Sequence, residues 1–170
     1  MEIDLTPILS GEVTRLPFEI TGTLSDSIWG EEVTFPEPIR ASGAIKNMAG
    51  YMQITLDAFF VYETACARCL APIRRECKLT LEKGVCRAGD LGDEENEEYL
   101  TYEGRVLSLD EALGDLFYMN LPYRHLCRED CKGYCPDCGK DLNQGPCNCT
   151  GKTVDPRLAV LAQLLTEKDE

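Results

Sequence analysis

The sequence predicts an α+β protein whose main part is an antiparallel β-sheet or partly open barrel over about residues 12–107. Three observations predict it. Apolar and polar residues alternate at strand period through much of the first hundred residues. One amphipathic helical pattern follows, and a cysteine-rich segment without periodicity comes next. We therefore divide the chain into a β domain with its helix, residues 1–123, and a cysteine-rich segment with a C-terminal helix, residues 124–170.

Four segments account for the sheet. Residues 14–24 mix β-branched and aromatic residues, and residues 39–46 and 51–62 are joined by a short loop in which Gly50 can take a positive φ. The alternation in the third segment breaks at residues 59–61, which predicts either a bulge or a stretch covered on both faces. Residues 73–85 resume the alternation, with most basic side chains on the solvent face and towards the hairpin tip.

One packing helix is expected over about residues 109–120. Ser108 to Glu111 has the pattern of a capping box, and Pro122 ends the helix. The apolar stripe consists of Leu109, Ala112, Leu113, Leu116 and Phe117. Near the chain end, Asp155 and Pro156 predict the start of a short helix over about residues 156–167.

The net charge of −13 argues against a nucleic-acid binder that uses its whole surface. By segment, however, residues 66–87 carry +4 and residues 124–157 carry +1, while the rest is acidic, with six carboxylates in residues 90–98. Any RNA contact is thereby restricted to the two cysteine-bearing segments. The sequence also has no run long enough to cross a bilayer and no signal-peptide pattern at its start, so we expect a cytoplasmic protein.

Ten cysteines accompany a single histidine, and in a reducing compartment such cysteines are thiols or metal ligands. Cys135 and Cys138, followed by Gly139, are typical of a zinc knuckle, because two thiolates at this spacing point at one metal and glycine permits the tight turn. Four thiolates select Zn²⁺ and leave no open position, which predicts a structural site.

The sequence does not decide which two cysteines complete this site. Cys147 and Cys149 are the simplest choice, and the competing ligands are Cys127 and Cys131.

A second Cys-x2-Cys occurs at Cys66 and Cys69. It could form a second zinc site with Cys127 and Cys131, and the alternatives are a purely structural turn or a redox pair. His125 is not expected to be a ligand, and we expect Cys77 to be an inert core residue. The chain has no nucleophile elbow, phosphate-binding loop or open metal motif, so we expect no catalytic residues and no enzymatic activity.

Three features together resemble the YceD-like family, the large ribosomal RNA subunit accumulation proteins, in its zinc-cluster-containing type. They are CARCL at residues 66–70, the run CKGYCPDCGKDLN at residues 131–143, and DPRLAVL at residues 155–161. The resemblance spans essentially the whole chain. It implies a role in the accumulation, processing or stability of large-subunit ribosomal RNA, without enzymatic activity.

We therefore interpret the chain as a non-catalytic ribosome-biogenesis factor that contacts large-subunit ribosomal RNA or a pre-ribosomal particle. The alternative is a protein-interaction module that binds a basic ribosomal protein through its acidic surface. The candidate RNA-binding residues are the basic side chains of the two cysteine-bearing segments: Arg68, Arg74, Arg75, Lys78, Arg124, Arg128, Lys132 and Lys140.

Overall fold

The computed structural model describes residues 1–24, 33–90 and 98–149, and the chain forms two compact units, Met1–Cys127 and Arg128–Glu170. We call them unit 1 and unit 2 and describe each by itself. The expected C-terminal helix over residues 156–167 and most of the acidic stretch at residues 90–98 lie outside the described residues. Within the described part of the chain, every helix is too short or too polar to cross a membrane.

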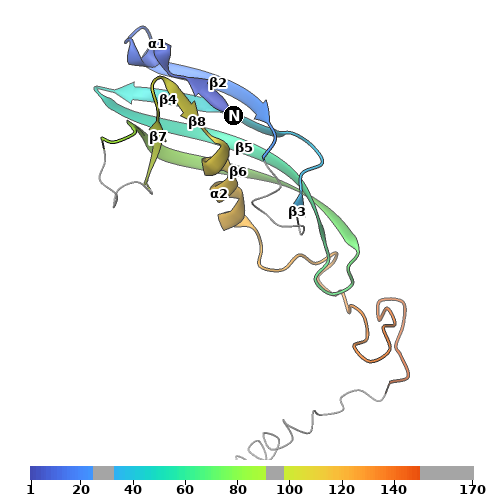
Figure 1. The fold of residues 1–170 in the computed structure, drawn as a ribbon. Helices are drawn as coiled ribbons and strands as arrows, with labels where there is room; N and C mark the ends of the chain where they lie inside the picture. Colours follow the sequence, from blue (N-terminus) through green and yellow to red (C-terminus); the bar gives the residue numbers. More distant parts are fainter. Residues whose placement is uncertain (25–32, 91–97, 150–170) are drawn as a thin grey trace, which may run out of the picture. The chain divides into compact units, whose positions relative to one another are not determined.

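Unit 1 is built around a six-stranded sheet with the order β2-β4-β5-β6-β7, and β3 pairs with β5 (Figure 1). The pairs are antiparallel except β6–β7, which is parallel. The predicted antiparallel sheet is therefore confirmed in its open form, since the described strands form no closed barrel. The strands are β2 (Arg15–Gly22), β3 (Val33–Thr34), β4 (Ile39–Met48), β5 (Tyr51–Ala65), β6 (Pro72–Arg87) and β7 (Tyr99–Tyr102).

The remaining elements of unit 1 are short. The strands β1 (Glu2–Asp4) and β8 (Val106–Ser108) form a separate two-stranded antiparallel ribbon, and helix α1 (Thr6–Leu9) follows β1. Helix α2 (Asp110–Asn120) confirms the predicted packing helix. Sequence patterning missed β1 and α1, because three or four residues are too few to display a period.

The core of unit 1 lies between one face of the sheet and α2, which covers that face in Figure 1. Every second residue of β5 from Met52 to Tyr62 is buried there, as the alternation predicts. Phe117 of α2 packs into this face, with its ring centroid 5.0 Å from that of Phe60 and 5.2 Å from that of Tyr62. This aromatic contact joins the helix to the middle of the sheet.

The β5–β6 hairpin is regular along its whole length. Its register runs without interruption from Met52 opposite Val85 to Ala65 opposite Pro72. The bulge considered for residues 59–61 is therefore absent, and the alternation breaks because Phe60, Val61 and Tyr62 are all buried, so both faces are covered there.

The predicted capping box at the start of α2 is wrong. No side chain caps the helix, and Leu109 occupies the N-cap position. Ser108 is the last residue of β8, where it pairs with Glu2, so its backbone is committed to a strand rather than to the helix end. The backbone N–H of Leu109 instead donates to the carbonyl of Met1 at 2.9 Å.

Gly43 of β4 lies where the strands β4 and β5 approach each other closely. A Cβ built there would lie 2.1 Å from the carbonyl oxygen of Thr55 and 2.7 Å from the Cα of Leu56, which are backbone atoms of β5. Gly43→Ala should therefore destabilise the protein by about 1–3 kcal/mol, the usual cost of overpacking. Urea unfolding measures this, with the exposed neighbour change Ser42→Ala as a control that should stay within about 0.5 kcal/mol. Equal stability of the two variants would contradict the close approach.

Candidate metal centres

Unit 2 has no helix or longer strand in residues 128–149, and its turns gather thiols. The N–H of Cys135 donates to the carbonyl of Lys140 at 2.8 Å, and the N–H of Gly139 donates to the carbonyl of Cys135 at 2.9 Å. Gly139 has a φ of +71°, the left-handed conformation expected after the second cysteine of the knuckle. This tight turn brings Cys135 and Cys138 to one side.

The sulfur atoms of Cys135, Cys138, Cys147 and Cys149 lie within 4.8 Å of one another. Backbone N–H groups of Cys138 and Asp137 donate to the Cys135 sulfur and, with the neighbouring thiols, lower its pKa to about 7. The other thiols, with burial, raise the pKa of Cys149 to about 12, because the group cannot hold several thiolates side by side without a cation. A divalent ion would stabilise all four thiolates at once.

Asn143 makes several hydrogen bonds within residues 128–143, and sequence patterning did not assign it a role. Its side-chain oxygen accepts hydrogen bonds at 2.8 Å from the Arg128 guanidinium and from the Lys132 backbone N–H. Its side-chain nitrogen donates to the Cys131 sulfur at 3.6 Å. Asn143 therefore positions Cys131 from the opposite side of the loop. The only signal of this role in the sequence was the presence of an asparagine at the end of the run at residues 131–143.

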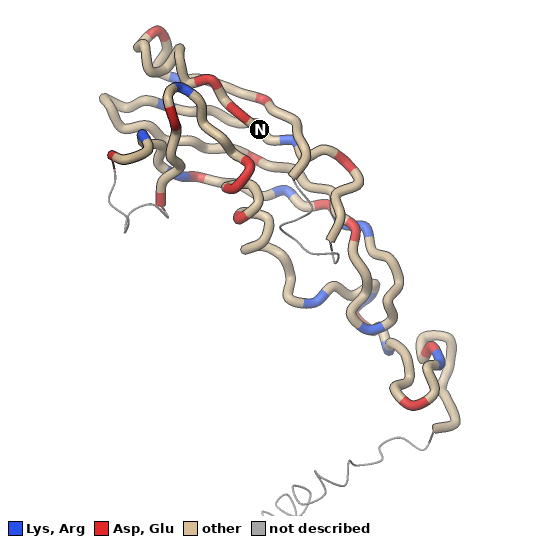
Figure 2. Tube along the Cα trace, in the orientation of Figure 1, with Lys and Arg blue, Asp and Glu red and all other residues tan. Residues whose placement is uncertain are grey.

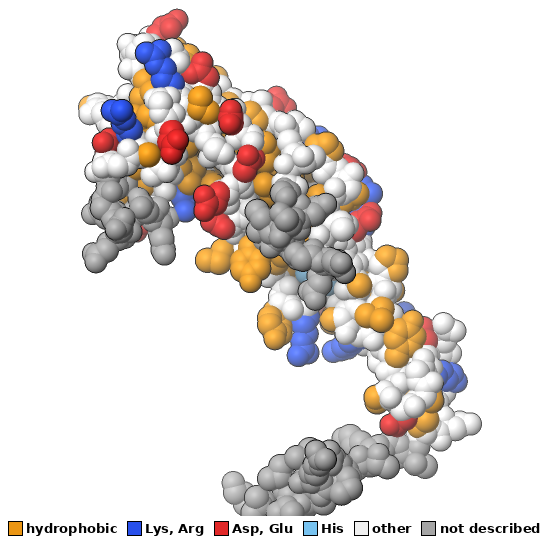
Figure 3. All heavy atoms as spheres, in the orientation of Figure 1, with side chains coloured by type: hydrophobic (Ala, Val, Ile, Leu, Met, Phe, Trp, Pro, Cys, Tyr) orange, Lys and Arg blue, Asp and Glu red, His pale blue; other side chains and the backbone are white. Residues whose placement is uncertain are grey.

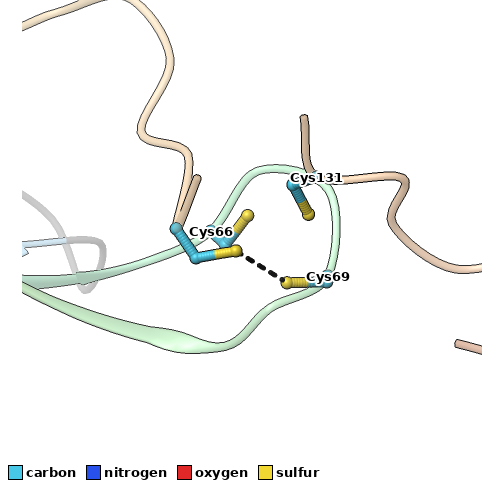
Figure 4. Close-up of side chains that lie close together, drawn as sticks. Cys66, Cys69 and Cys131 are labelled. Carbon is cyan, nitrogen blue, oxygen red and sulfur yellow. Dashed lines mark hydrogen bonds between the residues drawn. The ribbon is translucent and has the colours of Figure 1, made fainter. Parts of the chain in front are cut away.

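Unit 1 gathers a second set of thiols at the tip of the β5–β6 hairpin. Figure 4 shows Cys66 and Cys69 on this turn, with their sulfur atoms facing the same space. The Cys127 sulfur joins them, so that the three sulfur atoms lie within 4.8 Å of one another. The Sγ atoms of Cys69 and Cys127 are 3.6 Å apart, the interaction dashed in Figure 4. All ten cysteines lie in the described residues, and none is in a disulfide.

Cys127 reaches the hairpin tip because the segment after α2 is bound to it. The backbone N–H of Ala67 donates to the carbonyl of His125 at 2.8 Å. The guanidinium of Arg75 donates to the carbonyl of Leu126 at 3.0 Å. The His125 ring lies edge-on to Tyr62 at a centroid distance of 5.6 Å, and burial together with Arg75 lowers the pKa of His125. His125 thus has a packing role.

The Cys66 sulfur sits among hydrogen-bond donors. Its burial works to raise its pKa, but backbone N–H groups of Cys127, Arg68 and Cys69 outweigh burial and lower the pKa to about 6. Burial alone raises the pKa of Cys77, which packs against the core as expected for an inert thiol. The contrast shows that Cys66 lies in a site that stabilises a thiolate.

Both groups could hold a metal ion, and all their donors are sulfur. Soft thiolates in tetrahedral arrangement suit zinc, which fits the donor set of unit 2. Four protein ligands would leave no position for a substrate. The geometry separates Cys127, which lies with the hairpin thiols of unit 1, from the group around Cys135.

Four of the arginines of unit 1 lie at one end. We call residues 64–75 and 121–127 the arginine end; it holds four arginines and no aspartate or glutamate. Figure 2 shows these Lys and Arg positions at the turn between β5 and β6 and in the segment after α2. In Figure 3, basic side chains lie beside hydrophobic ones where the chain leaves α2. Tyr123 is 95% exposed, and the guanidinium of Arg124 lies 5.9 Å from its ring centroid.

Two of the predicted basic residues of unit 1 already have acidic partners. Arg74 pairs with Glu37 and Glu63, and Lys78 pairs with Asp57 at 2.7 Å, so carboxylates already neutralise both. Arg75 lies on the opposite face of β6 from Arg74 and Lys78. The candidate RNA-binding residues of unit 2 are Arg128, Lys132 and Lys140.

Two of these side chains interact with other residues of unit 2. Arg128 binds Asn143 and lies 3.4 Å from Asp130, and the Lys140 ammonium donates to the carbonyl of Pro146 at 2.8 Å.

Comparison with known proteins gives relatives without assigned functions. An uncharacterized protein of Mycobacterium tuberculosis is 35% identical over 104 residues, which cover 59% of this chain and 49% of the relative. An uncharacterized protein of Mycobacterium leprae is 23% identical over 163 residues, 96% of this chain and 64% of the relative. The chain spans about half the length of the first of these relatives. No solved structure matches the chain.

A family model described as "Large ribosomal RNA subunit accumulation protein YceD" matches residues 54–165. The match includes most of the β5–β6 hairpin, all of α2 and both groups of cysteines. It covers more than half of the chain, and it agrees with the resemblance carried by the CARCL turn and the cysteine-rich run. The chain therefore belongs to the YceD family.

Proposed function

We propose that the protein is a non-catalytic ribosome-biogenesis factor that supports the accumulation of large-subunit ribosomal RNA by contacting RNA or a pre-ribosomal particle. The observation that carries the proposal is the family match, whose description names this RNA. The thiol groups support a non-catalytic role, since four thiolates on one ion leave no site for a reacting molecule.

The arginine end is the RNA-contacting surface in this proposal. It combines positive charge with an exposed aromatic ring at Tyr123, and RNA-binding surfaces pair phosphate contacts with stacking on unpaired bases. Arg68 lies on the hairpin segment of this surface and Arg124 on the segment after α2. The acidic remainder of the chain would repel RNA elsewhere and so orient the protein.

Charge removal at the arginine end tests this surface. Arg68→Gln with Arg124→Gln should weaken binding to precursor large-subunit RNA. The slope of log affinity against log salt concentration should fall by about 1–2, since each phosphate contact on a single strand contributes about 0.7. Filter binding across a salt series measures both quantities.

The matched control removes the same charge elsewhere. Arg15→Gln with Arg40→Gln changes two exposed arginines of β2 and β4 and should leave the salt slope unchanged. If both double variants bind as the wild type does, the arginine end is not the contact surface. Binding of a basic ribosomal protein by the acidic surface would then be the better reading.

We also propose that the thiol group of unit 2 holds a structural Zn²⁺ on Cys135, Cys138, Cys147 and Cys149. The support is their mutual distance within 4.8 Å in a segment rich in glycine and proline. The ion would supply the folding free energy that this loop cannot obtain from a hydrophobic core.

Substitution of a knuckle cysteine tests the zinc site. Cys138→Ser should lower the zinc content by one equivalent per chain and expose residues 128–149 to protease, while unit 1 stays folded. Elemental mass spectrometry and limited proteolysis measure these outcomes. Cys86→Ser, at a half-buried thiol of β6 outside both groups, is the control and should retain all the metal. Unchanged zinc content in Cys138→Ser would overturn the assignment.

A further inference from the structure

The turn at Cys66 repeats the backbone of the turn at Cys135, although the two lie in different units. In the second turn, the N–H of Cys135 bonds to the carbonyl five residues on, and its carbonyl accepts from the N–H four residues on, at Gly139. In the first turn, Cys66 makes the same two bonds, with Ala71 and Leu70, each at 2.9 Å. The two hairpin turns are therefore equivalent residue by residue.

The equivalence extends to the sulfur atoms. In each turn, the backbone N–H groups two and three residues after the first cysteine donate to its sulfur: Arg68 and Cys69 to Cys66, and Asp137 and Cys138 to Cys135. Amides directed at a thiolate in this way are the feature by which a zinc knuckle stabilises its ligand.

Leu70 shows that this conformation is required at the first turn as well. It has a φ of +55° at the position where Gly139 has +71°. A leucine pays a steric cost in this region that glycine avoids. The side chain of Leu70 is also 71% exposed, so packing does not compensate for the cost. The two turns therefore share a left-handed residue four positions after the first cysteine.

The third thiol arrives at a distance that suits a metal. Four sulfurs at about 2.3 Å from a tetrahedral zinc lie about 3.8 Å from one another. The Sγ atoms of Cys69 and Cys127 are 3.6 Å apart, close to this value and far longer than the bond of about 2.05 Å in a disulfide. Unit 1 thus presents three thiols in the arrangement of three zinc ligands.

We propose that the protein has a second structural zinc site at the tip of the β5–β6 hairpin, with Cys66, Cys69 and Cys127 as ligands and Cys131 as the fourth. The sequence supplies Cys131, since only three residues separate it from Cys127, and four residues of chain reach at most about 14 Å. Asn143 holds the Cys131 sulfur through its side-chain nitrogen. The ion would fasten the segment after α2 to the hairpin and so hold the two halves of the arginine end together.

Zinc content per chain tests the second site. The wild type should bind two equivalents, and Cys66→Ser with Cys69→Ser should bind one. Cys138→Ser should also bind one, which it retains at the hairpin. Cys77→Ser, at a thiol of β6 outside both groups, should bind two. One equivalent in the wild type, lost completely in Cys138→Ser, would overturn the second site and leave the first intact.

Cobalt substitution identifies the fourth ligand from the visible absorption spectrum of the bound ion, and this readout does not depend on RNA binding. In Cys138→Ser, one bound Co²⁺ should give the intense visible absorption of a tetrahedral four-thiolate centre, and Cys131→Ser in the same background should reduce the thiolate-to-cobalt band by about a quarter. An unchanged band would show that Cys131 is not the ligand. Absence of any tetrahedral cobalt spectrum in folded Cys138→Ser, with circular dichroism of the sheet retained, would overturn the site as a whole.

These measurements are independent of the RNA proposal. Loss of RNA binding with two zinc ions retained would count against the arginine end alone. Two zinc ions in a protein that binds no RNA would support the metal sites and contradict the proposed function.

Discussion

Burial of one face of β5 against α2 is the interaction on which the remaining structure depends. β5 pairs with β3, β4 and β6, and its inward side chains meet Phe117 at the centre of the core. Removing this apolar surface from water is the main source of stability in unit 1, since no buried polar or charged residue occurs among the described ones. The same strand continues past the core to Ala65, directly before Cys66. A strand held by packing therefore presents the thiols of the hairpin tip.

Patterning predicted the elements that depend on local periodicity and missed those that depend on distant pairing. The alternation of Met52, Ile54 and Leu56 predicts β5 because successive side chains of a strand lie on opposite faces of the sheet. The parallel position of β7 depends on a partner across an acidic stretch, and the β1–β8 ribbon joins residues about a hundred positions apart. The capping-box motif at Ser108 failed for a related reason, since a strand pairing invisible in the local sequence had already engaged that residue.

The candidate sites were also predictable only where they depend on local sequence. The spacing of Cys135 and Cys138, with Gly139 after them, predicted the turn that the structure contains, because a knuckle is a local conformation. The spacing could not decide where Cys127 lies, since that depends on how the segment after α2 returns to the hairpin. Nor could it reveal that acidic neighbours on other strands already pair with Arg74 and Lys78. Charge along a sequence therefore shows where basic residues occur and not which of them already have acidic partners.

The unbroken register of β5 and β6 has a consequence for how the chain tolerates genetic change. Fourteen successive pairs connect the core to the turn with no bulge to absorb an extra residue. Inserting one codon anywhere along β5 would turn its inward side chains to solvent on one side of the insertion, and would also shift the loop carrying Cys66 relative to the carbonyl of His125. Packing and thiol geometry would fail together. Length variation among related chains should therefore accumulate at the loops between strands and spare this hairpin.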